Sequence, residues 1–79
     1  MPTMPDYQRV TDDLRAKIRS GAAGYLPGDK LPTKRQLMSI YDVNQQSVDT
    51  AMILLKAEGL VVGHQGRGTY VANPLPESN

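Results

Sequence analysis

The sequence predicts a single small domain, mainly α-helical with a small antiparallel β-hairpin at its C-terminal end. Three observations predict it. Apolar residues recur at steps of three and four along three stretches before Gly59, which is the period of helices buried on one face. After Gly59 two short β-forming runs flank a glycine-rich segment, as in a hairpin. The chain has 79 residues and no cysteine, so one core must be stabilised by packing alone.

Length and composition exclude several classes of protein. The chain is 39% apolar and 22% charged with a net charge of +1, which is ordinary for a folded domain. A domain this small buries only roughly 60% of its unfolded surface, which leaves little room for a deep substrate cavity, and we expect no enzyme. Its one histidine, His64, has no cysteine beside it, so we expect no metal site and no cofactor.

The two ends of the chain differ from its middle. Residues 1–5 contain two prolines and nothing to bury, and residues 74–79 repeat this pattern, so we expect a disordered N-terminus, a domain over 6–73 and a linker or tail. The start lacks the pattern of a signal peptide. The longest aliphatic run, Ala51–Leu55, is five residues against the roughly 20 of a membrane span. We expect a cytoplasmic protein without a membrane segment.

The first helix is expected from Tyr7 to the stop at Gly21. Its predicted buried stripe is Tyr7, Val10, Leu14 and Ile18, with charged residues on the other faces. Gly21 is a suitable C-terminal stop, and the glycines and proline of Gly24–Gly28 predict a turn. Tyr25 within this turn either packs on the domain or faces a partner.

The second helix is expected to begin after Thr33. Lys30–Pro32 can form only a short extended piece, because Pro32 lacks an N–H donor. Thr33 and Gln36 fit a capping box, in which each residue accepts the other's backbone N–H. The inner face of this short helix is predicted to comprise Leu37, Ile40 and Tyr41.

The third helix is expected over Gln45–Ala57. Asp42–Asn44 interrupts the helical pattern, Asn44 is a favourable N-cap, and Gly59 is a suitable stop. The predicted buried stripe is Val48, Ala51, Met52 and Leu55, and the predicted outward residues are Gln46, Asp49, Thr50 and Ile53.

The hairpin is expected to pair Leu60–Val62 with Thr69–Val71 across a polar loop over Gly63–Gly68. His64 is expected in this loop, either simply exposed or touching phosphate or a groove of DNA.

The order helix, extended piece, helix, turn, helix and hairpin is that of a winged helix-turn-helix with three helices plus a wing. A slim helix with a polar outer face fits the major groove of DNA, and its first turn presents free N–H groups to phosphate. Arg67 lies between Gly66 and Gly68, and arginines enter a narrow minor groove. We expect the recognition helix, 45–57, in the major groove and the wing, 63–68, in the minor groove.

Four segments resemble one family in order and spacing. They are Gly28-Asp-Lys-Leu-Pro-Thr-Lys-Arg-Gln-Leu37, Val43-Asn-Gln-Gln-Ser-Val-Asp-Thr-Ala-Met52, Leu55-Lys-Ala-Glu-Gly-Leu60 and Gly66-Arg-Gly-Thr-Tyr-Val71. Together they are similar to the N-terminal winged-helix DNA-binding domain of GntR-family bacterial transcription regulators. The resemblance covers about 7 to 72.

The resemblance implies double-stranded DNA as the partner, bound at a palindromic operator by a homodimer. It also implies a larger C-terminal domain that dimerises and senses a small-molecule effector, so an effector is expected only if such a domain exists. The chain is then either a piece ending in the linker between domains or a minimal regulator. Arg35 matches a DNA-contacting arginine of the family, and Ser47 matches a small hydroxyl residue of the recognition helix. Gln45 and Asp49 stand where the family usually has arginines.

The residues expected at DNA fall in three groups, at the phosphate backbone, at the base edges and, with Gly66, Arg67 and Gly68, in the minor groove. Lys34 and Arg35 are expected on the backbone, and Gln45, Gln46, Ser47 and Asp49 near base edges, since Gln reads adenine and Asp accepts from the cytosine amino group. The full set of expected contacts is Lys34, Arg35, Asn44, Gln45, Gln46, Ser47, Asp49, His64, Gly66, Arg67 and Gly68.

The alternative is a winged helix that binds protein without DNA, with Asp49 and Ile53 at the partner. DNA binding is favoured over this alternative if the folded domain brings Arg35, the Gln45 end of the third helix and Arg67 together on one basic face.

Overall fold

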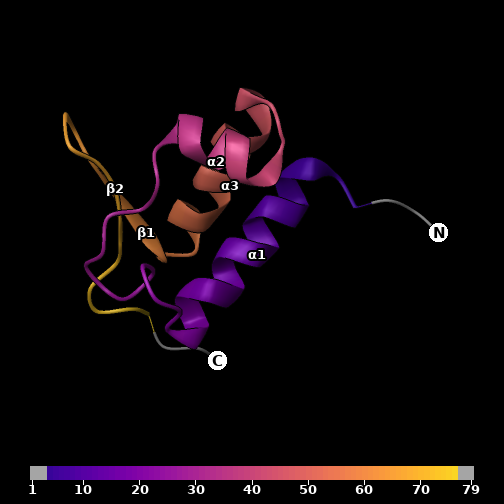
Figure 1. Ribbon diagram of the computed structural model, residues 1–79. Helices are drawn as coiled ribbons and strands as arrows, with labels where there is room; N and C mark the ends of the chain where they lie inside the picture. Colours follow the sequence, from indigo (N-terminus) through magenta and orange to yellow (C-terminus); the bar gives the residue numbers. More distant parts are fainter. Residues whose placement is uncertain (1–3, 77–79) are drawn as a thin grey trace.

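The computed structural model describes residues 4–76 and contains three helices followed by a hairpin (Figure 1). The elements are α1 (Asp6–Ser20), α2 (Lys34–Tyr41), α3 (Gln45–Ala57), β1 (Val61–His64) and β2 (Gly68–Val71). The predicted fold class is therefore confirmed. The predictions of disorder for residues 1–3 and of a tail for 77–79 lie outside the described residues.

Helix α1 buries one stripe, which comprises Val10, Thr11, Leu14 and Ile18. Tyr7 was expected on this stripe, but it is 38% exposed, because the first turn of α1 extends beyond the core. The Thr11 hydroxyl donates to the Tyr7 carbonyl at 2.6 Å, which satisfies the only buried polar side chain among the described residues. Gly21 ends the helix in the left-handed conformation, which glycine adopts without steric cost.

Helix α2 begins with the predicted capping box. The Thr33 hydroxyl accepts from the Gln36 N–H at 3.1 Å, and the Thr33 N–H donates to the Gln36 side chain at 2.8 Å. Leu37 and Tyr41 are buried, whereas the prediction that Ile40 faces inward is wrong, because this side chain is 55% exposed. A helix of eight residues contacts the core through a single row spaced by four, and Ile40 lies about 60° around the helix from Leu37 and about 100° from Tyr41.

Helix α3 is buried along Val48, Ala51 and Leu55. The Asn44 side chain caps it by accepting from the Ser47 N–H at 2.9 Å, as predicted. Met52, expected inside, is half-buried, and Thr50, expected outside, is also half-buried. The buried stripe is thus narrower than the sequence pattern predicts.

The strands of the hairpin are longer than predicted. Pairing runs from Val61↔Val71 to His64↔Gly68, so the connecting turn comprises only residues 65–67 rather than 63–68. Gly66 and Gly68 both have positive φ, which lets the chain reverse within this short turn. His64 is therefore a strand residue, not a loop residue, and its ring stands edge-on to Tyr70 at 5.0 Å.

The short piece before α2 joins the hairpin. Lys30 forms an isolated antiparallel bridge with Tyr70, and the Leu31 N–H donates to the Thr69 carbonyl at 2.8 Å. This pairing ties the chain between α1 and α2 to β2. It fixes where α2 starts relative to the hairpin.

The core lies where α1, α3 and the hairpin meet. Its buried members are Val10, Leu14, Ile18, Leu31, Leu37, Tyr41, Val48, Ala51, Leu55, Leu60, Val61 and Val71. Leu75, in the segment expected to be a linker or tail, packs against this cluster. Between residues 4 and 76, no helix combines the length and the apolar character that crossing a bilayer requires.

Polar side chains link α1 to the ends of the other helices. The Tyr41 hydroxyl donates to the Asp13 carboxylate, which also lies 2.8 Å from the Lys17 ammonium. The Arg15 guanidinium donates two hydrogen bonds to the carboxylate of Glu58, the residue just after α3. The Nε–Oε1 distance is 2.7 Å and the Nη2–Oε2 distance is 2.6 Å. Lys17 lowers the pKa of Asp13, with a further contribution from Tyr41, and Arg15 lowers the pKa of Glu58.

Leu55 is fully buried, so truncating it should destabilise the domain severely. We expect Leu55→Ala to lower the free energy of unfolding by about 2 to 5 kcal/mol, measured by urea titration. The matched control is Ile53→Ala on the same helix, where the side chain is 66% exposed and the expected change is within about 0.5 kcal/mol. Equal effects of the two substitutions would contradict the core described here.

The domain should lose stability at alkaline pH. Burial, together with the bond to Asp13, raises the pKa of Tyr41 from 10 to about 12. A group whose pKa rises on folding stabilises the native state below its unfolded pKa, and this contribution is lost as pH rises through the folded pKa. We expect the free energy of unfolding to decline between pH 10 and about 12.

The matched variant is Tyr41→Phe. It should decline less in that interval, with a residual loss from Lys17, whose pKa is also raised, mainly by Asp13. Identical declines in urea titrations of the two proteins would exclude Tyr41 as the source.

Candidate nucleic-acid interface

Three exposed segments lie toward one end of the molecule. The hairpin tip, α2 and the turn into α3 lie along the upper edge of Figure 1, whereas the C-terminal end of α1 lies at the bottom. The hairpin tip is separated from α2 in the sequence by the whole of α3, and α3 contacts α1, α2 and β1. The residues that were expected at DNA belong to the start of α2, to the turn into α3, to the first two turns of α3 and to the hairpin around its turn.

The first turn of α3 is open to solvent. Gln45 and Gln46 are exposed, and Ser47 is half-buried. Asn44 is exposed, but its side-chain oxygen is used by the cap on Ser47, so the amide nitrogen is the part free for a ligand. The free N–H groups of this turn carry the positive end of the helix dipole. The arrangement favours an anionic or acceptor-rich partner.

Two of the expected residues contact each other. The Lys34 ammonium at the start of α2 lies 2.6 Å from the Asp49 carboxylate on α3. Lys34, and more weakly Gln45, lowers the pKa of Asp49, so the carboxylate is charged at neutral pH. The sequence placed these side chains separately, on the backbone and at the bases, because nothing in a single sequence signals a contact between outward faces of two helices.

Arg35 and Arg67 remain available. Both side chains are exposed, and neither belongs to any of the ion pairs that the described residues form. Arg35 is in the first turn of α2, and Arg67 is in the turn of the hairpin. Their guanidinium groups can therefore contact phosphate or a groove without breaking a contact within the domain.

Two lysines that were not expected at the site flank the hairpin. A Cβ at Gly68 would lie 3.0 Å from the Lys30 side chain, and a Cβ at Gly63 would lie 3.3 Å from the Lys56 ammonium. Lys30 thus lies against β2, and Lys56 against β1. No periodicity or motif signals these contacts, because the lysines come from other segments. They make the surroundings of the hairpin more basic than Arg67 alone does.

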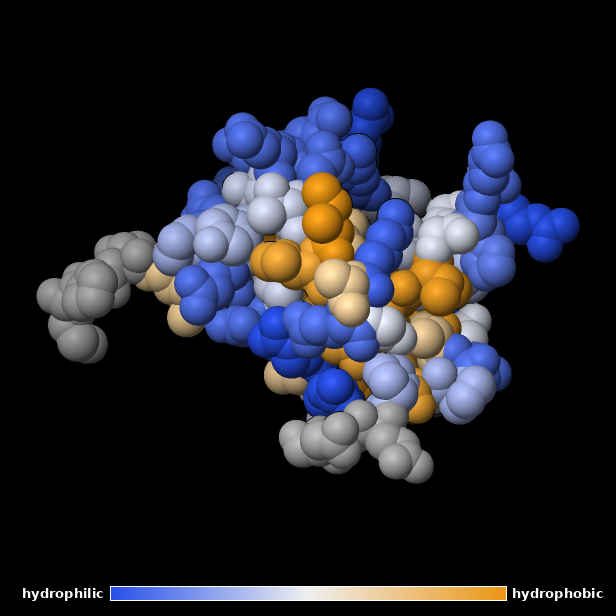
Figure 2. Space-filling model, turned by 180° about the vertical axis from the view of Figure 1, so that it is seen from behind, coloured by the Kyte–Doolittle hydropathy of each residue, from blue (hydrophilic) through white to orange (hydrophobic). Residues whose placement is uncertain are grey.

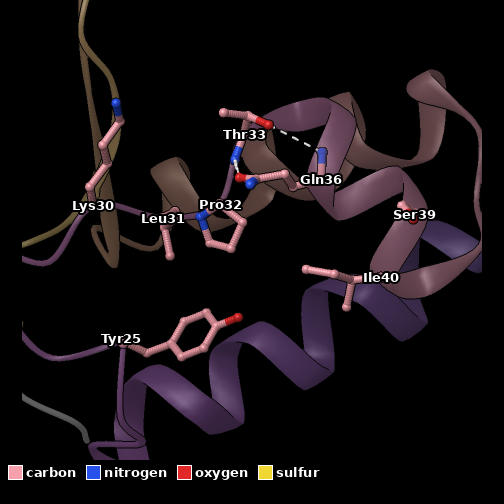
Figure 3. A pocket seen from close by; sticks show the side chains of 9 residues that line it. Tyr25, Lys30, Leu31, Pro32, Thr33, Gln36, Ser39 and Ile40 are labelled. Carbon is pink, nitrogen blue, oxygen red and sulfur yellow. Dashed lines mark hydrogen bonds between the residues drawn. The ribbon is translucent and has the colours of Figure 1, made fainter.

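An open groove of about 690 Å³ adjoins α2 (Figure 3). Tyr25 lies on one side and Leu31, Pro32 and Ile40 on the other. Polar side chains also line it, namely Lys30, Thr33, Gln36 and Ser39. Tyr25 is half-buried and packs against the core, so of the two alternatives for this residue the structure shows packing. The exposed face of Ile40 opens into this groove rather than toward the core. Between residues 4 and 76, no cluster of three potential ligands could hold a metal ion.

Comparisons with known proteins agree on one family. A family model described as "Bacterial regulatory proteins, gntR family" matches residues 6–71. The Histidine utilization repressor of Klebsiella aerogenes is 34% identical over 74 residues, which are 94% of this chain and 30% of that protein. The Exu regulon transcriptional regulator of Escherichia coli (strain K12) is 37% identical over 70 residues, which are 89% of this chain and 26% of that protein. The chain spans less than a third of the length of these regulators.

Solved structures agree with the sequence relatives. The AraR DBD in complex with operator ORX1 matches with a TM-score of 0.81 at 33% identity, covering 89% of this chain and 82% of that chain. The AraR DBD in complex with operator ORR3 gives 0.82 at 32% identity, covering 90% and 83%. The predicted family resemblance and the winged helix-turn-helix fold are confirmed. The relatives are regulators and not enzymes, which confirms that expectation too.

The cap on α3 should carry measurable stability. We expect Asn44→Ala to lower the free energy of unfolding by about 0.5 to 2 kcal/mol, because the Ser47 N–H loses its acceptor, and Asn44→Asp to be nearly neutral. Gln46→Ala, two residues on and exposed, is the control without a capping role. Urea titration of the four proteins checks this, and an Asn44→Ala variant as stable as the parent would contradict the cap.

Proposed function

The chain belongs to the gntR family of bacterial regulatory proteins, and on this premise we propose that residues 6–73 bind double-stranded operator DNA with sequence specificity. In the proposed complex α3 lies in the major groove and the hairpin reaches the minor groove. The observation that carries the proposal is the common position of three exposed segments at one end of the domain: the start of α2, the start of α3 and the hairpin tip (Figure 1).

Each segment has a distinct part in the proposed complex. Gln45, Gln46, Ser47 and Asp49 are near base edges, where an amide pairs with adenine and a carboxylate accepts from cytosine. Lys34 and Arg35 hold the phosphate backbone, with the free amide of Asn44 and the ring of His64 as further contacts. Arg67 enters the minor groove, and Gly66 and Gly68 let the backbone approach the sugar-phosphate wall.

The proposed binding depends only moderately on charge. Residues 30–71 carry a net charge of +2, and one lysine of this stretch is paired with Asp49. Proteins that contact six to ten phosphates lose roughly 10³- to 10⁵-fold in affinity between 50 and 200 mM salt. We expect a shallower dependence here. The two lysines beside the hairpin, Lys30 and Lys56, support binding at the wing.

We further propose that this domain acts as the DNA-reading part of a cytoplasmic transcription regulator. Two copies on a palindromic operator are the proposed assembly, because two-fold symmetric DNA is matched by a protein dimer. Regulators at 34% and 37% identity are more than three times as long as this chain. A second domain that dimerises and binds a small-molecule effector is part of the proposal for the whole protein.

A protein contact is the second candidate function. Ile53 is 66% exposed on α3, and Val62 is 41% exposed on β1, so both large apolar side chains are open to solvent. Figure 2 shows apolar surface at the centre of one face, with hydrophilic residues around it. Such a surface favours contact with protein, and it is compatible with DNA binding through other residues.

Arg67→Ala should weaken binding to a duplex selected from a random pool by roughly tenfold, within the about 1 to 3 kcal/mol expected of one groove contact. The fold should be unaffected, since Arg67 is exposed in a turn. Arg19→Ala removes the same charge from the exposed last turn of α1 and is the matched control. Fluorescence anisotropy titrations measure both, and unchanged affinity in Arg67→Ala would exclude the wing from the interface.

A further inference from the structure

The ion pair between Lys34 and Asp49 stands out by its position. Of the five ion pairs formed by residues 4–76, three lie within α1 and one joins α1 to Glu58. The fifth joins α2 to α3 through the two side chains that face the proposed DNA surface, with 48% and 41% of those side chains exposed. It is therefore the ion pair that a duplex would meet.

The pair changes what each partner offers to DNA. An ammonium 2.6 Å from a carboxylate presents almost no net charge to a phosphate several ångströms away. If Lys34 moved to a phosphate, the Asp49 carboxylate would remain next to the polyanion without a partner, which is unfavourable. On most sequences the move of Lys34 to a phosphate therefore gains little binding free energy. The new Lys34–phosphate contact is offset by repulsion between the Asp49 carboxylate and the DNA.

The balance changes where a base supplies a hydrogen-bond donor. Cytosine presents an amino group in the major groove, and a carboxylate is its acceptor. With Asp49 bonded to that amino group, Lys34 is free to bind phosphate, and both charges are again satisfied. The two contacts then form together or not at all.

We propose that the Lys34–Asp49 ion pair couples phosphate binding to base recognition. Lys34 then contacts the DNA backbone only where a cytosine amino group donates a hydrogen bond to the Asp49 carboxylate. The inference rests on the proposed function and adds to it a source of specificity. The pair weakens binding to arbitrary DNA. On sequences without a cytosine amino group opposite Asp49, the Lys34 ammonium stays bound to the carboxylate and does not contact phosphate. Asp49 is then a specificity-determining residue and not merely a weak substitute for arginine.

The experiment compares Asp49→Asn with a charge-matched control, Asp42→Asn. Asp42 is exposed, forms no ion pair among the described residues and occupies the left-handed conformation that asparagine accepts. Both variants add one unit of charge, and only the first frees Lys34. Lys34→Gln and the double variant Lys34→Gln/Asp49→Asn complete a cycle. Thermal melts confirm that all five proteins, the parent included, are folded.

Affinity for a random-sequence duplex is measured by anisotropy between 50 and 200 mM salt. We expect Asp49→Asn to bind roughly 2- to 5-fold more tightly than the parent, as expected for freeing one exposed ion-pair partner. Its plot of log affinity against log salt should be steeper by about one unit, for one added phosphate contact. The double variant should return to the parent's slope. Asp42→Asn should show the smaller affinity gain of net charge alone and no change in slope.

Selection of bound duplexes from a random pool tests the base contact. The parent should show a preference for cytosine at one position of each half-site, and Asp49→Asn should lose that preference while keeping the others. Equal salt slopes for Asp49→Asn and Asp42→Asn, or an unchanged selected motif, would overturn the coupling even though the parent binds DNA. Failure of the parent to bind any duplex at low salt would instead overturn the proposed function, so the two failures are distinguishable.

Discussion

The structure depends on the packing of α3 against α1. Val48, Ala51 and Leu55 are fully buried on α3, and they meet Val10, Leu14 and Ile18 of α1 in one cluster. This contact uses the inner face of α3 along its whole length, so its first turn and outer face are left to solvent. A surface helix can enter a groove of DNA only if its other side is held in this way. The same cluster receives the hairpin through Leu60, Val61 and Val71, which fixes the wing relative to α3.

Charged residues divide into two groups with different consequences. The pairs on α1, with Tyr41 and Glu58 as their partners, link the helices away from the proposed interface. Such exposed pairs contribute little stability individually, but they occupy most of the acidic side chains of α1. At the interface Lys34 is paired with Asp49, whereas Arg35 and Arg67 keep their donors. The net charge of +1 therefore says less about the interface than the partners of individual residues do.

Much of the fold could be predicted because it depends on neighbours in sequence. The capping box of Thr33 and Gln36, the Asn44 cap and the stop at Gly21 are contacts between residues at most four apart. The buried stripes of α1 and α3 follow from helical periodicity. Tyr7 and Ile40 were misassigned, and the hairpin loop was predicted three residues too long. At Tyr7 the apolar pattern continued beyond the end of the core, and at Ile40 it was wider than the buried row of the helix. In the hairpin, backbone pairing extended into residues that the pattern assigned to the loop.

By itself the sequence determined the three helices, the hairpin, their order and the family, since local propensity and motif spacing are properties of the chain alone. It also identified the segments of the candidate interface. Only the tertiary structure decided which side chains in those segments are free. Lys34 forms an ion pair with Asp49, and Lys30 and Lys56 lie beside the hairpin. The Ile40 side chain lines a groove. The physical reason is that these contacts join residues of different helices, strands and loops, and their geometry exists only once the core has set how those elements pack.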